Sequence, residues 1–261
     1  MQLTGNADQG WCLIPDWPAP EKVVALSTTR LGGHSKKPYH DFNLASHVGD
    51  DTDTVARNRG QLQSCLDSDI GLQWLQQVHG DHVVTANRVR SEPPVADAIF
   101  TRVPGIACCV ATADCLPVLF ASADGREIAA AHAGWRGLAA GILERTIDKF
   151  SNLPDNLLAW MGPAIGPCHF EVGGEVKDRF LCGETIADQQ SILNCFTPGA
   201  GPDKWMADLY QLARLRLKNM GIKQIFGGEF CTYCDASRFY SHRRGNPTGR
   251  MVSLIYINPS K

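Results

Sequence analysis

A thiol and an imidazole stand at the two ends of one hydrophobic hairpin in this sequence. Residues 113–137 read ADCLPVLFASADGREIAAAHAGWRG, which is two apolar runs joined by a short polar turn. Cys115 opens the first run and His132 closes the second, with Asp114 and Arg136 beside them. These residue types are typical of a metal site, or of a cysteine nucleophile with its base.

A zinc site is the first interpretation of this pair. Zinc in proteins is bound by cysteine sulfur and histidine nitrogen, and a catalytic zinc has three protein ligands and one open position. His79 is the best third ligand, because Gly80 and Asp81 break the apolar run around it and place its imidazole at a strand end. The spacings along the chain are too long for a zinc finger and fit ligands that come from separate strands.

Two other interpretations use the same pair of residues. In one, Cys115 is a nucleophile, His132 is its base, Asp114 or another carboxylate orients the pair, and Arg136 favours the thiolate. In the other, Cys115 and His132 are ordinary core residues, since cysteine is commonly buried. The residues alone leave these alternatives open.

Two glycine-containing segments offer backbone N–H groups to an anion. In STTRLGGHS, Arg30 precedes Gly32 and Gly33, and in MGPAIGPCHFEVGGE four glycines punctuate a passage from strand to helix. Amides together with a guanidinium suit a phosphate or a carboxylate. Neither segment contains GxGxxG or GxxxxGK[ST], and tight turns are the alternative explanation for the glycines.

The chain has ten cysteines, most of them inside apolar stretches such as GIACCVATADC, which predicts reduced core thiols. Cys231 and Cys234 in CTYC have the spacing of a zinc knuckle or a redox motif. No second CxxC and no histidine nearby in the sequence completes a tetrahedral set. We therefore expect buried free cysteines at these two positions and leave them outside the site.

The composition favours one domain with a small-molecule substrate. The 261 residues are 44% hydrophobic, and 25 Lys and Arg balance 27 Asp and Glu. The chain therefore has no strong positive electrostatic field that would attract nucleic acid or an anionic membrane. The start MQLTGNADQGWCLIPDW does not resemble a secretory signal, and no apolar run is long enough to span a bilayer. We expect a cytoplasmic protein whose oligomeric state the sequence does not specify.

The hydrophobic pattern predicts a mixed α/β unit with layered sheets. Apolar runs predict strands over 22–29, 105–112, 116–122, 127–133, 156–162, 222–228 and 250–257. Helical spacing predicts helices over 137–150 and 205–221. The Pro- and Asp-rich segments 91–97 and 196–204 are expected to be loops.

Seven segments together resemble one known family, the YfiH-type laccase-domain proteins, also called the polyphenol oxidase or purine nucleoside phosphorylase family. They are TTRLGGHSKKPYHDFNLASHVGDD, WLQQVHG, TADCLPVLF, AAAHAGWRGLAAGIL, MGPAIGPCHFEVGGEV, DLYQLARLRL and GRMVSLIYI, and the match covers residues 11–257. The resemblance implies a single catalytic domain over 1–261, folded as a four-layer α/β/β/α sandwich. It also implies a metal site, usually zinc with copper possible, whose ligands are His79, Cys115 and His132. The second cysteine of CTYC departs from the family pattern.

The resemblance also implies roles for pocket residues and a set of activities. Catalytic roles fall on Cys115, His132, Arg30 and Arg136, and substrate binding falls on Asn43 and His47. The family is credited with phosphorolysis of adenosine, inosine and methylthioadenosine and with deamination of adenosine. Other attributions are copper-dependent phenol oxidation and the editing of peptidoglycan precursors, in which a wrong amino acid is removed from a muropeptide nucleotide. A non-catalytic zinc-binding protein is a further alternative.

Metal chemistry narrows this list. Oxidases of the laccase type need several histidine-rich copper centres, whereas the eight histidines of this chain include no HxH motif. A zinc ion with two histidines, one cysteine and an open position suits water activation for attack at purine C6. Phosphorolysis needs an oriented phosphate, for which Arg30, Arg136 and a glycine-rich loop are available. We therefore expect a zinc-dependent enzyme acting on purine nucleosides and phosphate.

Overall fold

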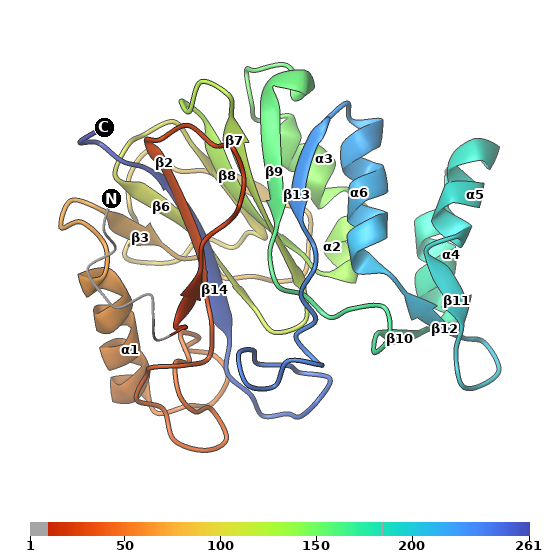
Figure 1. Cartoon of the computed structure of the whole chain (residues 1–261), viewed down its shortest axis with the longest axis horizontal. Helices are drawn as coiled ribbons and strands as arrows, with labels where there is room; N and C mark the ends of the chain where they lie inside the picture. The colour runs from red at the N-terminus through yellow and green to blue at the C-terminus, as the bar shows by residue number, and fades with distance from the viewer. Residues whose placement is uncertain (1–9, 184) are drawn as a thin grey trace.

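Two large mixed sheets lie face to face in the computed structural model, which describes residues 10–183 and 185–261 (Figure 1). The five-stranded sheet has the order β1-β2-β14-β6-β3, and the six-stranded sheet has the order β13-β9-β7-β8-β5-β4. The strands of the first sheet are Cys12–Leu13, Val23–Thr28, Met251–Ile257, Ile106–Thr112 and Gly71–Gln73, in that order. The strands of the second are Gln224–Gly227, Leu157–Met161, Leu116–Ser122, Ile128–Ala133, Ala98–Thr101 and Val83–Thr85.

The central strands β7 and β8 are apolar on both faces because both faces are covered. Every residue of these two strands is buried. Side chains alternate between the faces of a strand, so Leu119 and Ala130 point toward the five-stranded sheet, in a cluster with Ile255. Val118 and Phe120 point the other way, into the cluster under the helices. The hairpin that carries Cys115 and His132 is therefore held rigidly between layers.

Helices cover the outer faces of both sheets (Figure 1). Leu62 of α1 packs on the five-stranded sheet, while Leu138, Ile142 and Leu212 pack on the six-stranded sheet. The helices are α1 Thr52–Ser64, α2 Trp135–Ala140, α3 Ile142–Ile147, α4 Gly174–Leu181, α5 Ile186–Leu193 and α6 Leu209–Asn219, with a short 3-10 turn at Pro154–Asn156.

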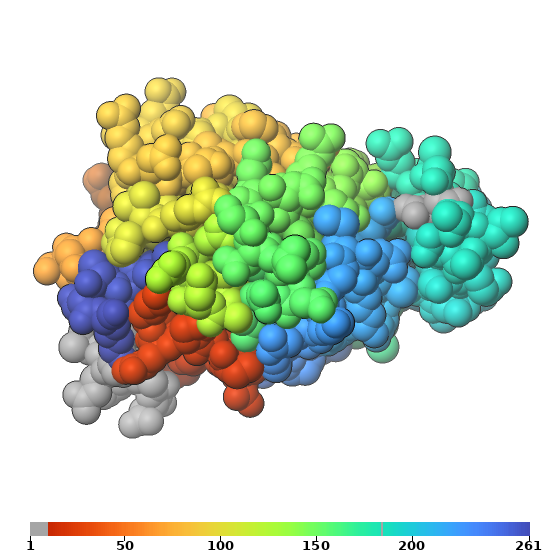
Figure 2. Space-filling model, turned by 90° about the horizontal axis from the view of Figure 1, so that it is seen from above, coloured from red at the N-terminus to blue at the C-terminus, as the bar shows by residue number. Residues whose placement is uncertain are grey.

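A third sheet, of order β10-β12-β11, joins α4 and α5 at one end of the molecule (Figures 1 and 2). Its strands are Glu171–Gly173, Lys204–Ala207 and Phe196–Pro198, in that order. The mixed α/β class predicted from the sequence is confirmed. This third sheet was not part of the predicted four-layer α/β/β/α sandwich.

The seven predicted strands are confirmed, but both predicted helices need correction. The helix expected over 137–150 is two short helices, because Gly141 has a φ of +92° and interrupts them. The helix expected from residue 205 begins at Leu209, where the Asp208 side chain accepts the Gln211 N–H as an N-cap. The preceding residues form β12, and the loop expected over 196–204 begins with β11.

Within the described ranges, no helix is long and apolar enough to cross a membrane. Residues 1–9, which begin the segment expected to lack a secretory signal, lie outside the described residues.

Candidate active site

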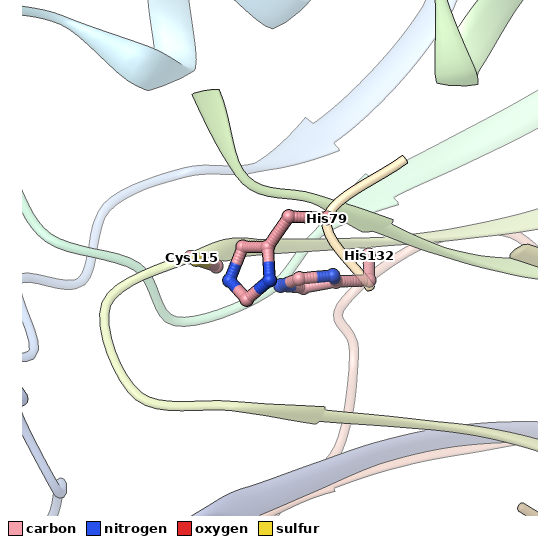
Figure 3. Close-up of side chains that lie close together, drawn as sticks. All are labelled: His79, Cys115 and His132. Carbon is pink, nitrogen blue, oxygen red and sulfur yellow. The ribbon is translucent and has the colours of Figure 1, made fainter. Parts of the chain in front are cut away.

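The β7–β8 hairpin places a cysteine and a histidine side by side. In its antiparallel register Leu116 pairs with Ala133 and Pro117 pairs with His132, so Cys115, one residue before β7, lies beside the imidazole of His132. His79 comes from the loop before β4, and its ring centroid is 4.8 Å from that of His132. The three candidate ligand atoms all lie within 4.8 Å of one another, and Figure 3 shows the three side chains converging. The predicted group is therefore assembled in the fold.

One buried carboxylate, Asp97, holds two of these three residues in place. Its Oδ1 lies 2.8 Å from His132 Nδ1 and accepts the His79 N–H at 2.9 Å. Its Oδ2 accepts the Gly80 N–H at 2.7 Å and the Val78 N–H at 3.2 Å. A carboxylate on one ring nitrogen fixes the orientation of a histidine and leaves the other nitrogen to a metal. Asp97 therefore sets both the ring of His132 and the backbone of His79, whose φ is +59°.

The charges in this group stabilise an ion pair between the Cys115 thiolate and the protonated His132 imidazole. Burial raises the pKa of Cys115, but the charge and hydrogen bond of His132, with those of His79, outweigh it and lower this pKa to about 6. Burial lowers the pKa of His132, whereas the Cys115 charge and the Asp97 hydrogen bond raise it to about 9. Burial raises the pKa of Asp97, but its hydrogen bonds to His132, Gly80 and Val78 hold it below its usual value. Cys115 is thus a thiolate at neutral pH.

Gly134, directly after β8, has no side chain, and this leaves room for the side chains of Cys115 and His79. A Cβ at this position would lie 3.0 Å from Cys115 Sγ and 3.4 Å from His79 Cδ2. A side chain at this position would therefore press on two of the three candidate ligands. In the segment STTRLGGHS, a Cβ on Gly33 would lie 2.4 Å from the Asp41 carbonyl oxygen, so backbone packing accounts for that glycine.

A cavity of about 360 Å³ opens beside the three candidate ligands. This volume falls in the range of small-molecule sites. Its wall contains apolar side chains that suit a planar base, including Trp135, and cationic side chains that suit an anion. The lining residues are His47, Gln77, His79, Ala111, Thr112, Ala113, Asp114, Cys115, His132, Trp135, Arg136, Ile165, Phe170, His242, Arg243 and Arg250.

Of the four predicted pocket residues, His47 and Arg136 line this cavity. Burial and the charge of Arg250 lower the pKa of His47, which favours its neutral form. The Arg136 guanidinium lies 4.4 Å from the Trp135 ring centroid. An arginine packed on an aromatic face keeps a defined orientation.

Arg30 and Asn43 are not among the cavity-lining residues. The Arg30 guanidinium donates to the His40 carbonyl at 2.8 Å and to the Ala236 carbonyl at 3.0 Å. The Asn43 Oδ1 accepts the backbone N–H of Arg250 at 3.0 Å. Both side chains therefore hold the backbone of loops around the cavity. Asn43 affects the cavity indirectly, because it positions the backbone of the lining residue Arg250.

Of the carboxylates left open by the sequence, Asp114 or another, the one that faces His132 is not Asp114. Asp114 accepts the Thr232 hydroxyl at 2.6 Å and the Arg243 N–H at 2.7 Å. Asp97 faces His132 instead. Its segment was expected to be a loop, and its only sequence signal is an aspartate directly before the apolar strand β5.

Sequence reasoning also missed three residues of the cavity wall, one histidine and two arginines, namely His242, Arg243 and Arg250. A signal for them exists, since the segment SHRRGNPTGR concentrates positive charge just before β14. The expectation that Cys231 and Cys234 are both buried is wrong, because Cys234 is exposed and Cys231 is only partly buried. A histidine does lie beside them, namely His169, which is 65 residues from Cys234 along the chain.

Comparisons with known proteins cover nearly the whole chain. A family model described as multi-copper polyphenol oxidoreductase laccase matches residues 24–258. The chain is 48% identical over 245 residues to the purine nucleoside phosphorylase YfiH of Escherichia coli, covering 94% of this chain and 98% of that protein. It is 49% identical over 245 residues to a purine nucleoside phosphorylase of Pseudomonas aeruginosa, with the same 94% and 98% coverage. A crystal structure of a Neisseria meningitidis protein matches with a TM-score of 0.89 at 43% identity, covering 95% of this chain and 99% of that one.

Proposed function

The chain belongs to the YfiH-type laccase-domain family, and we propose that it is a zinc-dependent purine nucleoside phosphorylase that also deaminates adenosine. One observation carries the proposal: a thiolate and two histidines, the histidines held by one buried carboxylate, face a cavity lined by arginines. The relatives named purine nucleoside phosphorylase support the substrate class. The ten cysteines are all free, which favours a reducing compartment such as the cytoplasm.

The donor set fits zinc. Two imidazole nitrogens and one thiolate are ligands that zinc prefers, and Asp97 supplies the carboxylate partner usual for a metal-bound histidine. His79 is exposed, Cys115 is partly buried and His132 is buried, so one side of the group faces the cavity. When bound there, zinc would supply Lewis-acid activation of water or substrate. Copper would also be compatible with these donors. The sequence, however, has no HxH motif of the kind found in the histidine-rich copper centres of an oxidase.

The cavity wall suits a nucleoside together with phosphate. Arg136, Arg243 and Arg250 present guanidinium groups that bind phosphate oxygens in a fixed plane. Two of them are already oriented, Arg243 by the Glu171 carbonyl at 2.9 Å and Arg250 by the Thr248 carbonyl at 2.8 Å. These contacts would hold phosphate in one orientation for attack on the ribose carbon.

The remaining wall residues suit the purine. Trp135 and Phe170 offer apolar faces against which a purine can pack. His242 offers a ring nitrogen to the departing base, which must take up a proton in phosphorolysis, and the neutral ring of His47 would offer the base a hydrogen bond. Deamination would instead require the purine C6 to lie toward His79, Cys115 and His132.

A second candidate function is hydrolysis of a muropeptide, by which a peptidoglycan precursor is edited. The observation that favours it is an adjoining cavity of about 400 Å³ that shares His79, Trp135 and Arg136 with the first. Glu175 and Arg179 line it as well, and a carboxylate and a guanidinium together suit the amine and carboxylate of an amino acid. A substrate longer than a nucleoside would reach both cavities.

The test is turnover by purified protein of known zinc content. Adenosine with phosphate should give adenine and ribose 1-phosphate in amounts that rise with phosphate, and adenosine without phosphate should still give inosine. His132→Ala should lower both rates by on the order of a hundredfold or more, since it removes a metal ligand. His82→Ala, prepared identically, is the matched control, because His82 is an exposed histidine on the same loop as His79.

Equal rates in His132→Ala and wild type would assign the activity to a contaminating host enzyme. Turnover of a muropeptide nucleotide, absent in His132→Ala, would then favour the second candidate.

A further inference from the structure

A second group of metal-ligating side chains lies outside the cavity, on the loops below the two sheets. It consists of His169, Cys231 and Cys234, whose candidate ligand atoms all lie within 4.8 Å of one another. Cys234 Sγ is 3.3 Å from His169 Nδ1. Cys168, the neighbour of His169 in the chain, is a further exposed thiol. Three side chains thus converge from two loops that are far apart in sequence.

The spacing of these atoms fits a tetrahedral zinc ion. With Zn–S bonds of about 2.3 Å and Zn–N bonds of about 2.0 Å, neighbouring donor atoms in a tetrahedron lie about 3.4 to 3.8 Å apart. The separation of 3.3 Å between Cys234 and His169 is close to this value. The 4.8 Å bound on the other separations requires side-chain movements of no more than about one ångström.

The surrounding backbone holds this group in place independently of any ion. Ala164 and Cys231 form an isolated parallel bridge, and the Thr232 N–H donates to the Ala164 carbonyl at 3.0 Å. The Gly166 N–H donates to Cys231 Sγ at 3.2 Å, and such an N–H···S bond stabilises a thiolate ligand. The ligands therefore lie on a preorganised pair of loops.

The His169 ring is fixed as well. It stacks on Tyr233, the residue before Cys234, with ring centroids 4.1 Å apart and an angle of 16° between the planes. This stacking orients the imidazole edge toward Cys234.

The loop that carries the two cysteines is long and irregular, and it forms part of the site. Residues 228–250 contain no helix and no strand beyond the isolated bridge, and irregular segments of this length are uncommon in a compact domain. Yet this loop forms part of the cavity wall through His242 and Arg243. Thr232, next to Cys231, also binds the Asp114 carboxylate beside the metal ligand Cys115.

We propose that His169, Cys231 and Cys234 bind a structural zinc ion that fastens the loop 228–250 to the loop 162–170. Binding releases the protons of the two thiols to solvent and leaves the redox state of the sulfurs unchanged. Cys168 is not one of the side chains that converge in this group, so the fourth position would be left to water. The ion would hold the cavity wall from outside the cavity and would take no part in the reaction.

The experiment counts zinc in four proteins purified under reducing conditions without chelators, loaded with zinc and freed of excess. Wild type should hold about two ions per chain, and Cys234→Ser and His132→Ala should each hold about one. The matched control is Cys182→Ser, which replaces an exposed free cysteine outside the group and should keep both ions. Cys234 is itself exposed, so its replacement by serine should leave the fold intact.

Cobalt separates the second site from the first. In His132→Ala, cobalt should give a thiolate-to-metal charge-transfer band, and the double variant with Cys234→Ser should lose it. A wild type with one ion per chain, kept in Cys234→Ser and lost in His132→Ala, would overturn the second site and leave the proposed function standing. An intact mass lighter by two hydrogens, with Cys231 joined to Cys234, would also overturn it in favour of a disulfide.

Discussion

Replacing Asp97 by Asn should weaken both the fold and the candidate metal site. The wild-type carboxylate is fully buried and faces His132 Nδ1 and three backbone N–H groups, those of Val78, His79 and Gly80. The Asn side chain has the same shape but only one oxygen. Whichever way the amide is turned, its NH₂ group faces two donors that the carboxylate accepted.

The size of the effect follows from these contacts. A buried donor left without a partner costs about 1 to 3 kcal/mol, and Val78 and His79 lie near enough to solvent for water to offset part of it. We therefore expect Asp97→Asn to lower the free energy of unfolding by about 2 to 3 kcal/mol. Loss of the carboxylate partner of a ligand histidine should weaken zinc binding by about 10- to 100-fold.

Two measurements test the prediction. Urea unfolding of the metal-free protein gives the change in stability, and competition with a chromophoric chelator gives the zinc affinity. Asp81→Asn is the matched control, since Asp81 forms a surface ion pair with Arg145 at 2.9 Å, and such pairs contribute about 0 to 1 kcal/mol.

The pH dependence of stability adds a third readout. Hydrogen bonding holds the pKa of Asp97 below its usual value. A depressed carboxyl pKa contributes stability above the unfolded pKa of about 3.9, which is lost as pH falls through the folded pKa. Asp97→Asn should therefore lose less stability on acidification than wild type. If the variant matched Asp81→Asn in stability and in zinc affinity, Asp97 would not be a positioning residue.

Three further perturbations have distinct expected outcomes. In metal-free protein, the rate of Cys115 alkylation should rise with pH around a midpoint of about 6, because the thiolate forms above its pKa, and bound zinc should block the reaction. An unchanged midpoint in His132→Ala would contradict the charge pairing between Cys115 and His132. Arg136→Lys should raise the Michaelis constant for phosphate, whereas Arg30→Lys should lower the melting temperature with that constant unchanged, since Arg30 binds backbone carbonyls. Steady-state kinetics and thermal unfolding separate the two effects, and the reverse pattern would refute the placement of Arg136 at the cavity and of Arg30 outside it. Gly134→Ala should weaken zinc binding, because its Cβ would lie 3.0 Å from Cys115 Sγ, and an unchanged affinity by chelator competition would show that the loop can relax.

Local pattern was enough to predict seven of the fourteen strands among the described residues, and to select the three candidate ligands that the fold brings together. Continuous apolar runs predicted β7 and β8 correctly because both faces of these strands are buried, and burial is what a run of apolar residues records. The helix expected over 137–150 was divided because Gly141 adopts a positive φ, which its neighbours in the sequence do not reveal. The strand β12 was included in a helix because its pairing with β10 and β11 depends on residues distant in the chain.

The sequence alone therefore determined the apolar hairpin, its thiol and imidazole at adjacent ends, and the donor chemistry suited to zinc. Only the tertiary structure decided which partners those groups meet. His132 meets Asp97 across 35 residues, Cys234 meets His169 across 65, and Arg243 meets Asp114 across 129. Such pairs leave no periodic signal, because hydrogen bonds and metal ligands act over a few ångströms in space and any separation along the chain can be closed by the packing of the sheets.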